Sequence, residues 1–256
     1  PYLKKPGAQD LSYRVLEAKR RLFPKNIQFV TCSEWLRDVA MSSSLLKDAQ
    51  VVAIPNPIDT DVFKPASASE RAVFRDENGI SPSAKILLFV AMKVSESYKG
   101  FRFLPEALQI LKALLPGESF EIVVLGKSDP SALSALPYPV HALGLVHGAE
   151  NLARIYGAAD VFITPSLADN LPNTVMESLS CGTPVVGFRT GGIPEMVGHQ
   201  QEGYIATQGD ARALAEGIQW IFSGKLPLSV LQQNARQKVE KTYANKVVAA
   251  QYLKVY

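Results

Sequence analysis

The sequence predicts an α/β protein built on a doubly wound parallel sheet. From residue 84 onward, short apolar runs alternate with segments of helical periodicity, at the spacing of strand–helix–strand units. The run 86–90, Ile-Leu-Leu-Phe-Val, is apolar throughout, as expected of a strand buried on both faces. Hydrophobic residues make up 47% of the chain and charged residues 20%, which is typical of a globular protein.

The first sixty residues predict two short strands and two helices. The strands are expected over 27–31 and 51–54, and a basic amphipathic helix over 11–23. Ser33 has the character of an N-cap for a second helix. Two prolines in three residues then require an extended connector, and we expect a domain boundary near it.

The regular part of the chain follows this connector. Expected strands are 86–90, 120–125, 140–143, 161–164, 185–188 and 204–206, and expected helices are 103–115, 149–159, 173–180, 194–197, 210–222 and most of 229–256. Pro116 and Gly117 end the first of these helices, and Gly182 ends the third. No internal repeat or low-complexity tract is present.

Composition excludes several classes of protein. No apolar run reaches about 18 residues, so no transmembrane helix is encoded. The net charge is +3 with the basic residues scattered, which disfavours a nucleic-acid binder. Cys32 and Cys181 lack metal-ligand spacing, so we expect reduced thiols, no bound metal and a cytoplasmic location. No signal peptide is visible, and because the chain opens at Pro1 we expect a fragment or a processed piece.

Ligands of open parallel sheets bind outside the carboxyl ends of the strands, and three junctions there carry informative residues. After 86–90, Lys99 is placed to meet a phosphate, and Lys93 lies in the same loop. Each could equally be a solvated surface lysine.

After 161–164, a loop leads into a helix that starts near Asn173 and Thr174, where unpaired amides make an anion site. Asp169 lies in the loop and Glu177 one turn into the helix, so both carboxylates can face one cleft and accept hydrogen bonds from sugar hydroxyls. The alternative for Glu177 is structural, because Thr174-x-x-Glu177 is also a capping-box pattern.

After 185–188, Gly191 and Gly192 let the backbone approach a ligand closely, although an ordinary tight turn explains them equally well. Together the three junctions describe a pocket with phosphate donors and hydroxyl acceptors. That chemistry suits a nucleotide diphosphate sugar.

An ordered set of motifs gives the chain a family resemblance over nearly its whole length. They are Ile54-Pro55-Asn56-Pro57-Ile58-Asp59, Tyr98-Lys99-Gly100, Val124-Leu125-Gly126, Gly144-Leu145-Val146, Tyr156-Gly157-Ala158-Ala159-Asp160-Val161, the carboxylate-x7-glutamate spacing from Asp169 to Glu177, and Gly191-Gly192-Ile193-Pro194-Glu195. With them the sequence resembles the retaining glycosyltransferases of family 4, which have two Rossmann-like domains in the GT-B arrangement.

The resemblance implies a domain plan. Residues 1–56 would be the tail of an N-terminal acceptor domain and its hinge, and 57–240 the Rossmann-like domain that binds the nucleotide-sugar donor. Residues 241–256 would form a C-terminal helix that returns to the first domain.

It also implies roles for the site residues. Glu177 would bind the ribose hydroxyls, Asp169 the donor sugar, and Lys99 the diphosphate as it leaves. Val146 would lie beside the base. Backbone amides of the loop would hold sugar and diphosphate; its residues are Asn170, Leu171, Pro172, Asn173 and Thr174.

The chain departs from the family pattern in three ways. The first signature carboxylate is usually glutamate and is Asp169 here, and Lys93 is the candidate for a second cation usually supplied by arginine. The glycine-rich loop and histidine of the first domain are missing; the chain's own histidines, His141, His147 and His199, are expected to be surface or loop residues. The chain is therefore expected to bind the donor but to transfer little or nothing.

The expected activity is transfer of a sugar, with retention, from a UDP- or GDP-linked donor to a glycan or lipid-linked acceptor, without a metal or other cofactor, in polysaccharide biosynthesis. Peripheral contact with the inner face of a membrane would come from the missing domain. Two alternatives stay open: a non-catalytic nucleotide-sugar-binding subunit, and a related GT-B epimerase or phosphorylase. A Rossmann dehydrogenase is disfavoured because no G-x-G-x-x-G follows the first strand. The base, sugar, acceptor and oligomeric state are not fixed by the sequence.

Overall fold

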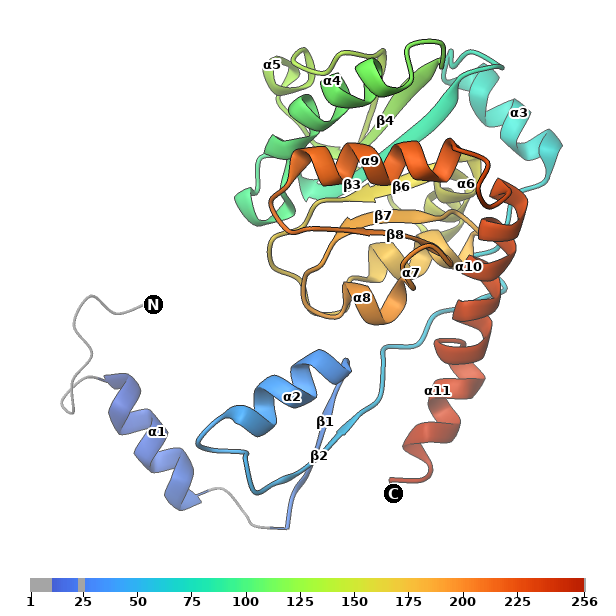
Figure 1. Ribbon diagram of the computed structural model, residues 1–256. Helices are drawn as coiled ribbons and strands as arrows, with labels where there is room; N and C mark the ends of the chain where they lie inside the picture. The colour runs from blue at the N-terminus through green and yellow to red at the C-terminus, as the bar shows by residue number, and fades with distance from the viewer. Residues whose placement is uncertain (1–10, 23–25, 256) are drawn as a thin grey trace. The chain divides into compact units, whose positions relative to one another are not determined.

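The computed structural model describes residues 11–22 and 26–255, and the chain divides into two compact units. The first unit runs to Ile54 and the second from Pro55 to Tyr256. Each unit is described by itself below, with the labels of Figure 1.

The first unit is a small α/β segment. Its described elements are α1 (Leu11–Leu22), β1 (Gln28–Thr31), α2 (Glu34–Ser42) and β2 (Gln50–Ala53), and β1 pairs with β2 in parallel. The Ser33 side chain accepts a hydrogen bond of 3.0 Å from the amide of Leu36, which confirms the expected N-cap. The predicted end of the first helix, Phe23, lies outside the described residues.

The second unit contains a parallel sheet of six described strands, which confirms the predicted fold class. The strands are β3 (Lys85–Lys93), β4 (Phe120–Lys127), β5 (Val140–Gly144), β6 (Val161–Thr164), β7 (Val185–Phe188) and β8 (Gly203–Ala206). Their order is β5-β4-β3-β6-β7-β8 (Figure 1). The chain therefore builds outward from β3 in one direction and from β6 in the other, and these two neighbours form the switch point where such sheets bind ligands.

Helices cover both faces of this sheet. On one face α4 (Leu104–Leu114) packs against α9 (Ala211–Phe222), and on the other α3 (Ala68–Glu77), α6 (Ala149–Ala158), α7 (Asn173–Ser180) and α10 (Leu228–Thr242) pack in succession (Figure 1). The shorter helices are η1 (Ser97–Lys99), η2 (Phe101–Phe103), α5 (Pro130–Leu133), α8 (Ile193–Met196) and α11 (Asn245–Tyr252). Completely buried side chains such as Leu87, Leu108 and Ile218 fill the layer beneath α4 and α9.

The helix α3 was not predicted from the sequence. It begins at a capping box in which Ser67 and Glu70 exchange hydrogen bonds. Two of its arginines then bind Asp160, at 2.5 Å for Arg71 and 3.3 Å for Arg75. The same carboxylate accepts a hydrogen bond of 2.7 Å from the amide of Ile86, so α3 is fixed to the start of the central strand.

Candidate functional site

A cavity of about 250 Å³ opens at the carboxyl ends of β3, β4 and β5, beside the start of α7. It is lined by Val90, Ala91, Met92, Lys99, Leu125, Gly126, Gly144, Leu145, Val146, Leu152, Tyr156, Thr174 and Glu177. The structure thus brings four of the residues predicted for the site, Lys99, Val146, Thr174 and Glu177, to one cavity.

Close backbone contacts fix the position of Lys99. Gly100 has a φ of +73°, and a Cβ atom there would lie 1.8 Å from the carbonyl oxygen of Pro165, so only glycine fits. The amide of Leu167 donates a hydrogen bond of 2.7 Å to the carbonyl of Tyr98. The loop after β3 is therefore held against the loop after β6, and Lys99 projects between them.

Lys99 and Asp169 form an ion pair across these two loops. The distance from Nζ of Lys99 to Oδ2 of Asp169 is 2.8 Å, and both side chains are largely buried. The pair places the Lys99 cation in the lining of the cavity, whereas Asp169 lies outside that lining. A diphosphate entering here would meet the ammonium group of Lys99.

Glu177 lies in the second turn of α7 and faces the cavity. The capping-box interpretation of this residue was wrong. The N-cap position of α7 is occupied by Pro172 and not by Thr174, and no side chain caps the helix. Burial raises the pKa of the Glu177 carboxyl, and the neighbouring Tyr156 hydroxyl opposes that shift. A ligand in the cavity would meet this side chain as a hydrogen-bond acceptor.

The start of α7 supplies uncapped amides next to Glu177. Pro172 accepts its hydrogen bond from the amide of Val175, at 3.0 Å, so the amides of Asn173 and Thr174 are the first in the helix. These groups lie at the positive end of the helix dipole. An anion beside Thr174 would be stabilised by hydrogen bonds from these amides and by the helix dipole.

The glycine turn after β7 packs closely against the loop that contains Asp169. Gly191 has a φ of +51°, and a Cβ atom there would lie 1.7 Å from the carbonyl oxygen of Asp169. The amide of Gly192 donates a hydrogen bond of 2.7 Å to the carbonyl of Asn170. Neither glycine lines the cavity, so their observed part is to let the two loops touch.

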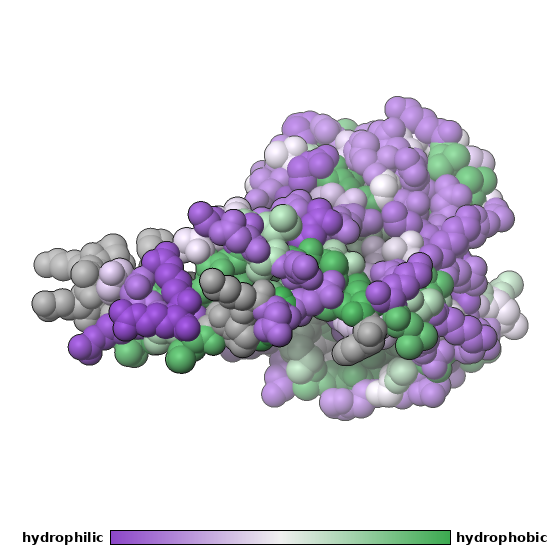
Figure 2. Space-filling view, turned by 90° about the horizontal axis from the view of Figure 1, so that it is seen from below, coloured by the Kyte–Doolittle hydropathy of each residue, from purple (hydrophilic) through white to green (hydrophobic). Residues whose placement is uncertain are grey.

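Hydrophobic side chains form the end of the cavity opposite α7. Val146 lies there with Leu145 and Met92, and the Met92 side chain is 73% exposed. On the face of the molecule that Figure 2 shows, hydrophobic residues lie among hydrophilic ones, so exposed apolar residues are not confined to this cavity. An apolar wall with exposed Met92 and Leu145 suits the flat face of a nucleic-acid base.

Other candidate residues lie outside the lining. Lys93 is exposed at the end of β3, where it pairs in register with Lys127. Leu171 is buried in the loop. The histidines also lie elsewhere: His141 contacts Glu121 at 2.6 Å, and His199 stacks on Tyr204.

Among the cavity residues to which sequence reasoning gave no role are Tyr156 and Met92. Tyr156 is a fully buried residue of α6 whose hydroxyl faces Glu177 without a hydrogen bond of regular geometry. Its place in the Tyr156-Gly157-Ala158-Ala159-Asp160 motif was the available signal. Met92 carried no signal, because its position depends on the irregular pairing of β3 with β4 beyond Val90.

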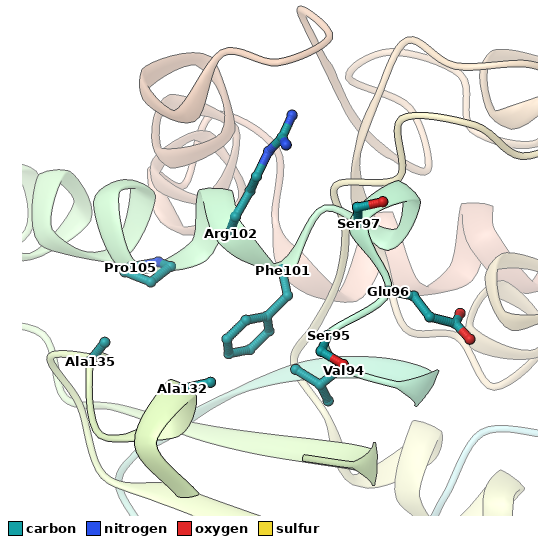
Figure 3. Close-up of a pocket in the computed structure, with 9 residues that line it drawn as sticks. All are labelled: Val94, Ser95, Glu96, Ser97, Phe101, Arg102, Pro105, Ala132 and Ala135. Atoms are coloured by element: carbon teal, nitrogen blue, oxygen red, sulfur yellow. The ribbon is translucent and has the colours of Figure 1, made fainter. Parts of the chain in front are cut away.

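A second cavity, of about 400 Å³, lies on the other side of the loop after β3 (Figure 3). Phe101 points into it, whereas Arg102 and Glu96 point away from its centre. It contains neither Lys99 nor Glu177. The cationic side chain of its lining, Arg102, points away from the space, so this cavity offers a phosphate less than the first one does.

No group of three or more histidine, cysteine or acidic side chains is arranged to hold a metal ion within residues 11–22 and 26–255. Over the same ranges, the helices are too short or too polar to cross a bilayer.

Comparison with known proteins gave one family match and several similar proteins. The family described as "Glycosyl transferases group 1" matches residues 84–223. An uncharacterised glycosyltransferase of Methanocaldococcus jannaschii is 25% identical over 240 residues, which cover 91% of this chain and 60% of that protein. The chain spans 60% or less of the length of such curated relatives.

Solved structures share the fold. A glycosyltransferase from Rickettsia africae superposes with a TM-score of 0.79 at 19% identity, covering 95% of this chain and 66% of that one. Anabaena HepE, in complex with UDP-glucose, gives a TM-score of 0.73 at 18% identity, covering 94% of this chain and 66% of HepE.

Proposed function

Because the chain belongs to the group 1 glycosyl transferases, we propose that its cavity binds a nucleoside diphosphate sugar whose sugar is transferred, with retention, to an acceptor hydroxyl. The observation that supports this most is the meeting of Lys99, the uncapped start of α7 and Glu177 at one cavity. A cation and free amides suit a diphosphate, and a carboxylate beside them suits ribose hydroxyls. That HepE has been solved with UDP-glucose supports the same class of donor.

We propose a role for each group in this reaction. Asn173 and Thr174 would bind the diphosphate through their amides, and Glu177 would accept hydrogen bonds from the ribose. As the bond between sugar and diphosphate breaks, negative charge grows on the leaving diphosphate. Lys99 would stabilise that charge while Asp169 orients the sugar.

Transfer also needs an acceptor, and we propose that these 256 residues bind the donor with little or no transfer by themselves. The donor groups all come from the second unit. The acceptor is proposed to be a glycan or a lipid-linked glycan. No residue of the donor cavity selects between these two.

The test is calorimetric titration of the chain with UDP, GDP and ADP. We expect saturable binding of UDP or GDP, and a weaker response to ADP. Subsequent incubation with the matching nucleotide sugar separates the remaining alternatives. An epimerase changes the sugar in the absence of an acceptor. When the longer protein and an acceptor are supplied, a transferase releases nucleoside diphosphate, whereas a non-catalytic module leaves the donor intact. Absence of binding for all three nucleotides would contradict the proposal.

A further inference from the structure

A third hollow lies at the opposite end of the sheet from the donor cavity. Its volume is about 540 Å³, and it is lined by Leu115, Gln200, Tyr204, Glu216, Gln219, Trp220, Ser223 and Lys225. Leu115 follows the end of α4, Ser223 follows the end of α9, and Gln200 precedes β8. All three positions belong to the amino ends of the parallel strands, whereas the donor cavity lies at the carboxyl ends.

Aromatic rings form one wall of this hollow. The ring centroids of Tyr204 and Trp220 are 6.1 Å apart with the planes tilted by 41°, and His199 stacks on Tyr204 at 4.4 Å. Tyr204 is seated against Gly217 of α9, where an added Cβ would fall 2.7 Å from the tyrosine ring. Nδ1 of His199 accepts a hydrogen bond of 3.2 Å from the amide of Ile205, which assigns the ring proton to Nε2.

Polar side chains with both donors and acceptors surround the rings. Gln200 and Gln219 supply amide groups, and Glu216 and Lys225 supply one charge of each sign. An amide offers two donors and two acceptor sites in one plane. The lining therefore has no net charge to favour a phosphate or a cation, but it can bind a ligand rich in hydroxyl groups.

The backbone at Gln200 strengthens this interpretation. Its φ of +63° is the only left-handed value at a non-glycine residue in the described part of the chain. Its amide donates a hydrogen bond of 2.7 Å to the carbonyl of Gly203, which holds the turn in this conformation. A side chain at such a position costs free energy that glycine avoids, and strain of this kind is concentrated at functional sites.

We propose that this hollow is a binding site for a neutral carbohydrate chain, separate from the donor cavity. The apolar C–H faces of sugar rings would pack on Tyr204 and Trp220, and the glutamine amides would bind the equatorial hydroxyls. The volume lies within the range of roughly 300–1,000 Å³ that small-molecule sites occupy, which suits about two sugar rings. The site would hold a glycan to the protein while the donor cavity works, and its binding does not depend on the proposed transfer.

The experiment uses the two tryptophans of the chain, Trp35 and Trp220. In a Trp35→Phe background, Trp220 is the only tryptophan, and its emission is followed while maltopentaose, cellopentaose or chitopentaose is added. At least one of these probes is expected to shift the emission saturably, with a Kd of about 1 mM or tighter. Saturating UDP should leave this response unchanged, and a parallel UDP titration reports the donor cavity separately.

Variants then separate a ligand role from a structural one. Gln200→Gly and Gln219→Ala are each expected to weaken carbohydrate binding roughly five-fold, the effect of one lost hydrogen bond. Gln200→Gly should unfold at the same temperature as its parent or higher, because glycine relieves the left-handed backbone. Gln233→Ala, at an exposed glutamine of α10 outside the hollow, is the matched control and should bind as the parent does.

Two results would overturn the proposal. One is the absence of a saturable response to all three oligosaccharides, or equal binding by Gln200→Gly, Gln219→Ala and the Gln233→Ala control. The other is a Trp220 signal that depends on protein concentration and not on oligosaccharide, which would assign the hollow to self-association. Loss of UDP binding with carbohydrate binding preserved would instead count against the donor cavity alone.

Discussion

The ionised Glu177 side chain lowers the stability of the fold. It lies in α7 but does not cap that helix, and burial raises its pKa above the ordinary value of 4.5. A protonated carboxyl in this place stabilises the fold relative to an ionised one. That contribution is complete below 4.5 and is lost as the pH rises through the raised pKa. Above the raised pKa the ionised side chain therefore lowers the free energy of unfolding.

Glu177→Gln should separate stability from ligand binding. The variant is expected to unfold at the same or a higher temperature at about pH 8, because the buried charge is gone. UDP affinity should fall by about 1.5–3 kcal/mol, the scale of a hydrogen bond to a charged group. Thermal unfolding and calorimetry measure the two effects. A variant that is less stable yet binds UDP normally would assign Glu177 to the structure alone.

Lys99→Ala is expected to weaken UDP binding by about 1–3 kcal/mol, because the diphosphate loses its cation. The matched control is Lys93→Ala, which removes an exposed lysine of the same loop region that does not line the cavity. Calorimetric titration of both variants compares them directly. Equal losses in both would mean that general positive charge, and not the placement of Lys99, attracts the nucleotide.

At the level of elements, the site depends on places where two loops touch through a glycine. Gly100 has a left-handed backbone conformation and also packs closely against the loop after β6, because a Cβ atom on Gly100 would lie 1.8 Å from the carbonyl oxygen of Pro165. Gly79 has a similar φ of +64° but nothing within 4 Å of its Cβ position. This pair separates the cost of backbone strain from the cost of displacing a loop.

Gly79→Ala is therefore expected to destabilise the fold by about 1 kcal/mol, the cost of a left-handed alanine. Gly100→Ala should cost more, because the loop that carries Lys99 must also move away from Pro165. We expect UDP affinity to fall in Gly100→Ala and to stay unchanged in Gly79→Ala. Chemical denaturation and calorimetry test this, and an equal, small cost in both variants would mean that the loops do not need their close contact.

The strands of the second unit could be predicted from the sequence, whereas the helix α3 was not predicted. Each predicted strand of the second unit is present within a few residues of its predicted bounds, because continuous apolar runs determine buried strands with little ambiguity. The segment 68–77 has Phe74 as its one buried residue and therefore lacks an apolar stripe. Its capping box at Ser67 and Glu70 was the signal that could have revealed it.

The site was predictable where it follows from topology and unpredictable where it follows from packing. Lys99 lies in the segment after β3 and Glu177 in the helix after β6, and these strands are neighbours, so the convergence of the two residues follows from the parallel sheet. The ion pair between Lys99 and Asp169 depends on how two loops contact each other over a separation of 70 residues, which no local pattern determines. Lys93 resembled Lys99 in sequence, and only the structure separates them.

At the level of the whole molecule, the lining of the proposed donor cavity comes from the second unit. All of its lining residues lie between Val90 and Glu177. The start of that unit is secured from within, since Arg236 of α10 donates hydrogen bonds to the carbonyls of Phe63 at 2.7 Å and Thr60 at 3.0 Å. The connector after the unit boundary is thus part of the same folded body.

A chain reduced to residues 55–256 is expected to fold and to bind UDP as the full chain does. The physical reason is that neither the core nor the cavity takes a described residue from the first unit. Circular dichroism and calorimetry provide the measurement. A shortened chain that folds but binds UDP more than about ten-fold more weakly would show that the first unit contributes to the site.

The most direct test of the account is an experimental structure of the chain bound to UDP. We expect the ribose hydroxyls within hydrogen-bond distance of Glu177, the diphosphate at Lys99 and the amides of Asn173 and Thr174, and uracil against Val146. UDP bound in the cavity behind the β3 loop, or bound with its ribose away from Glu177, would contradict it.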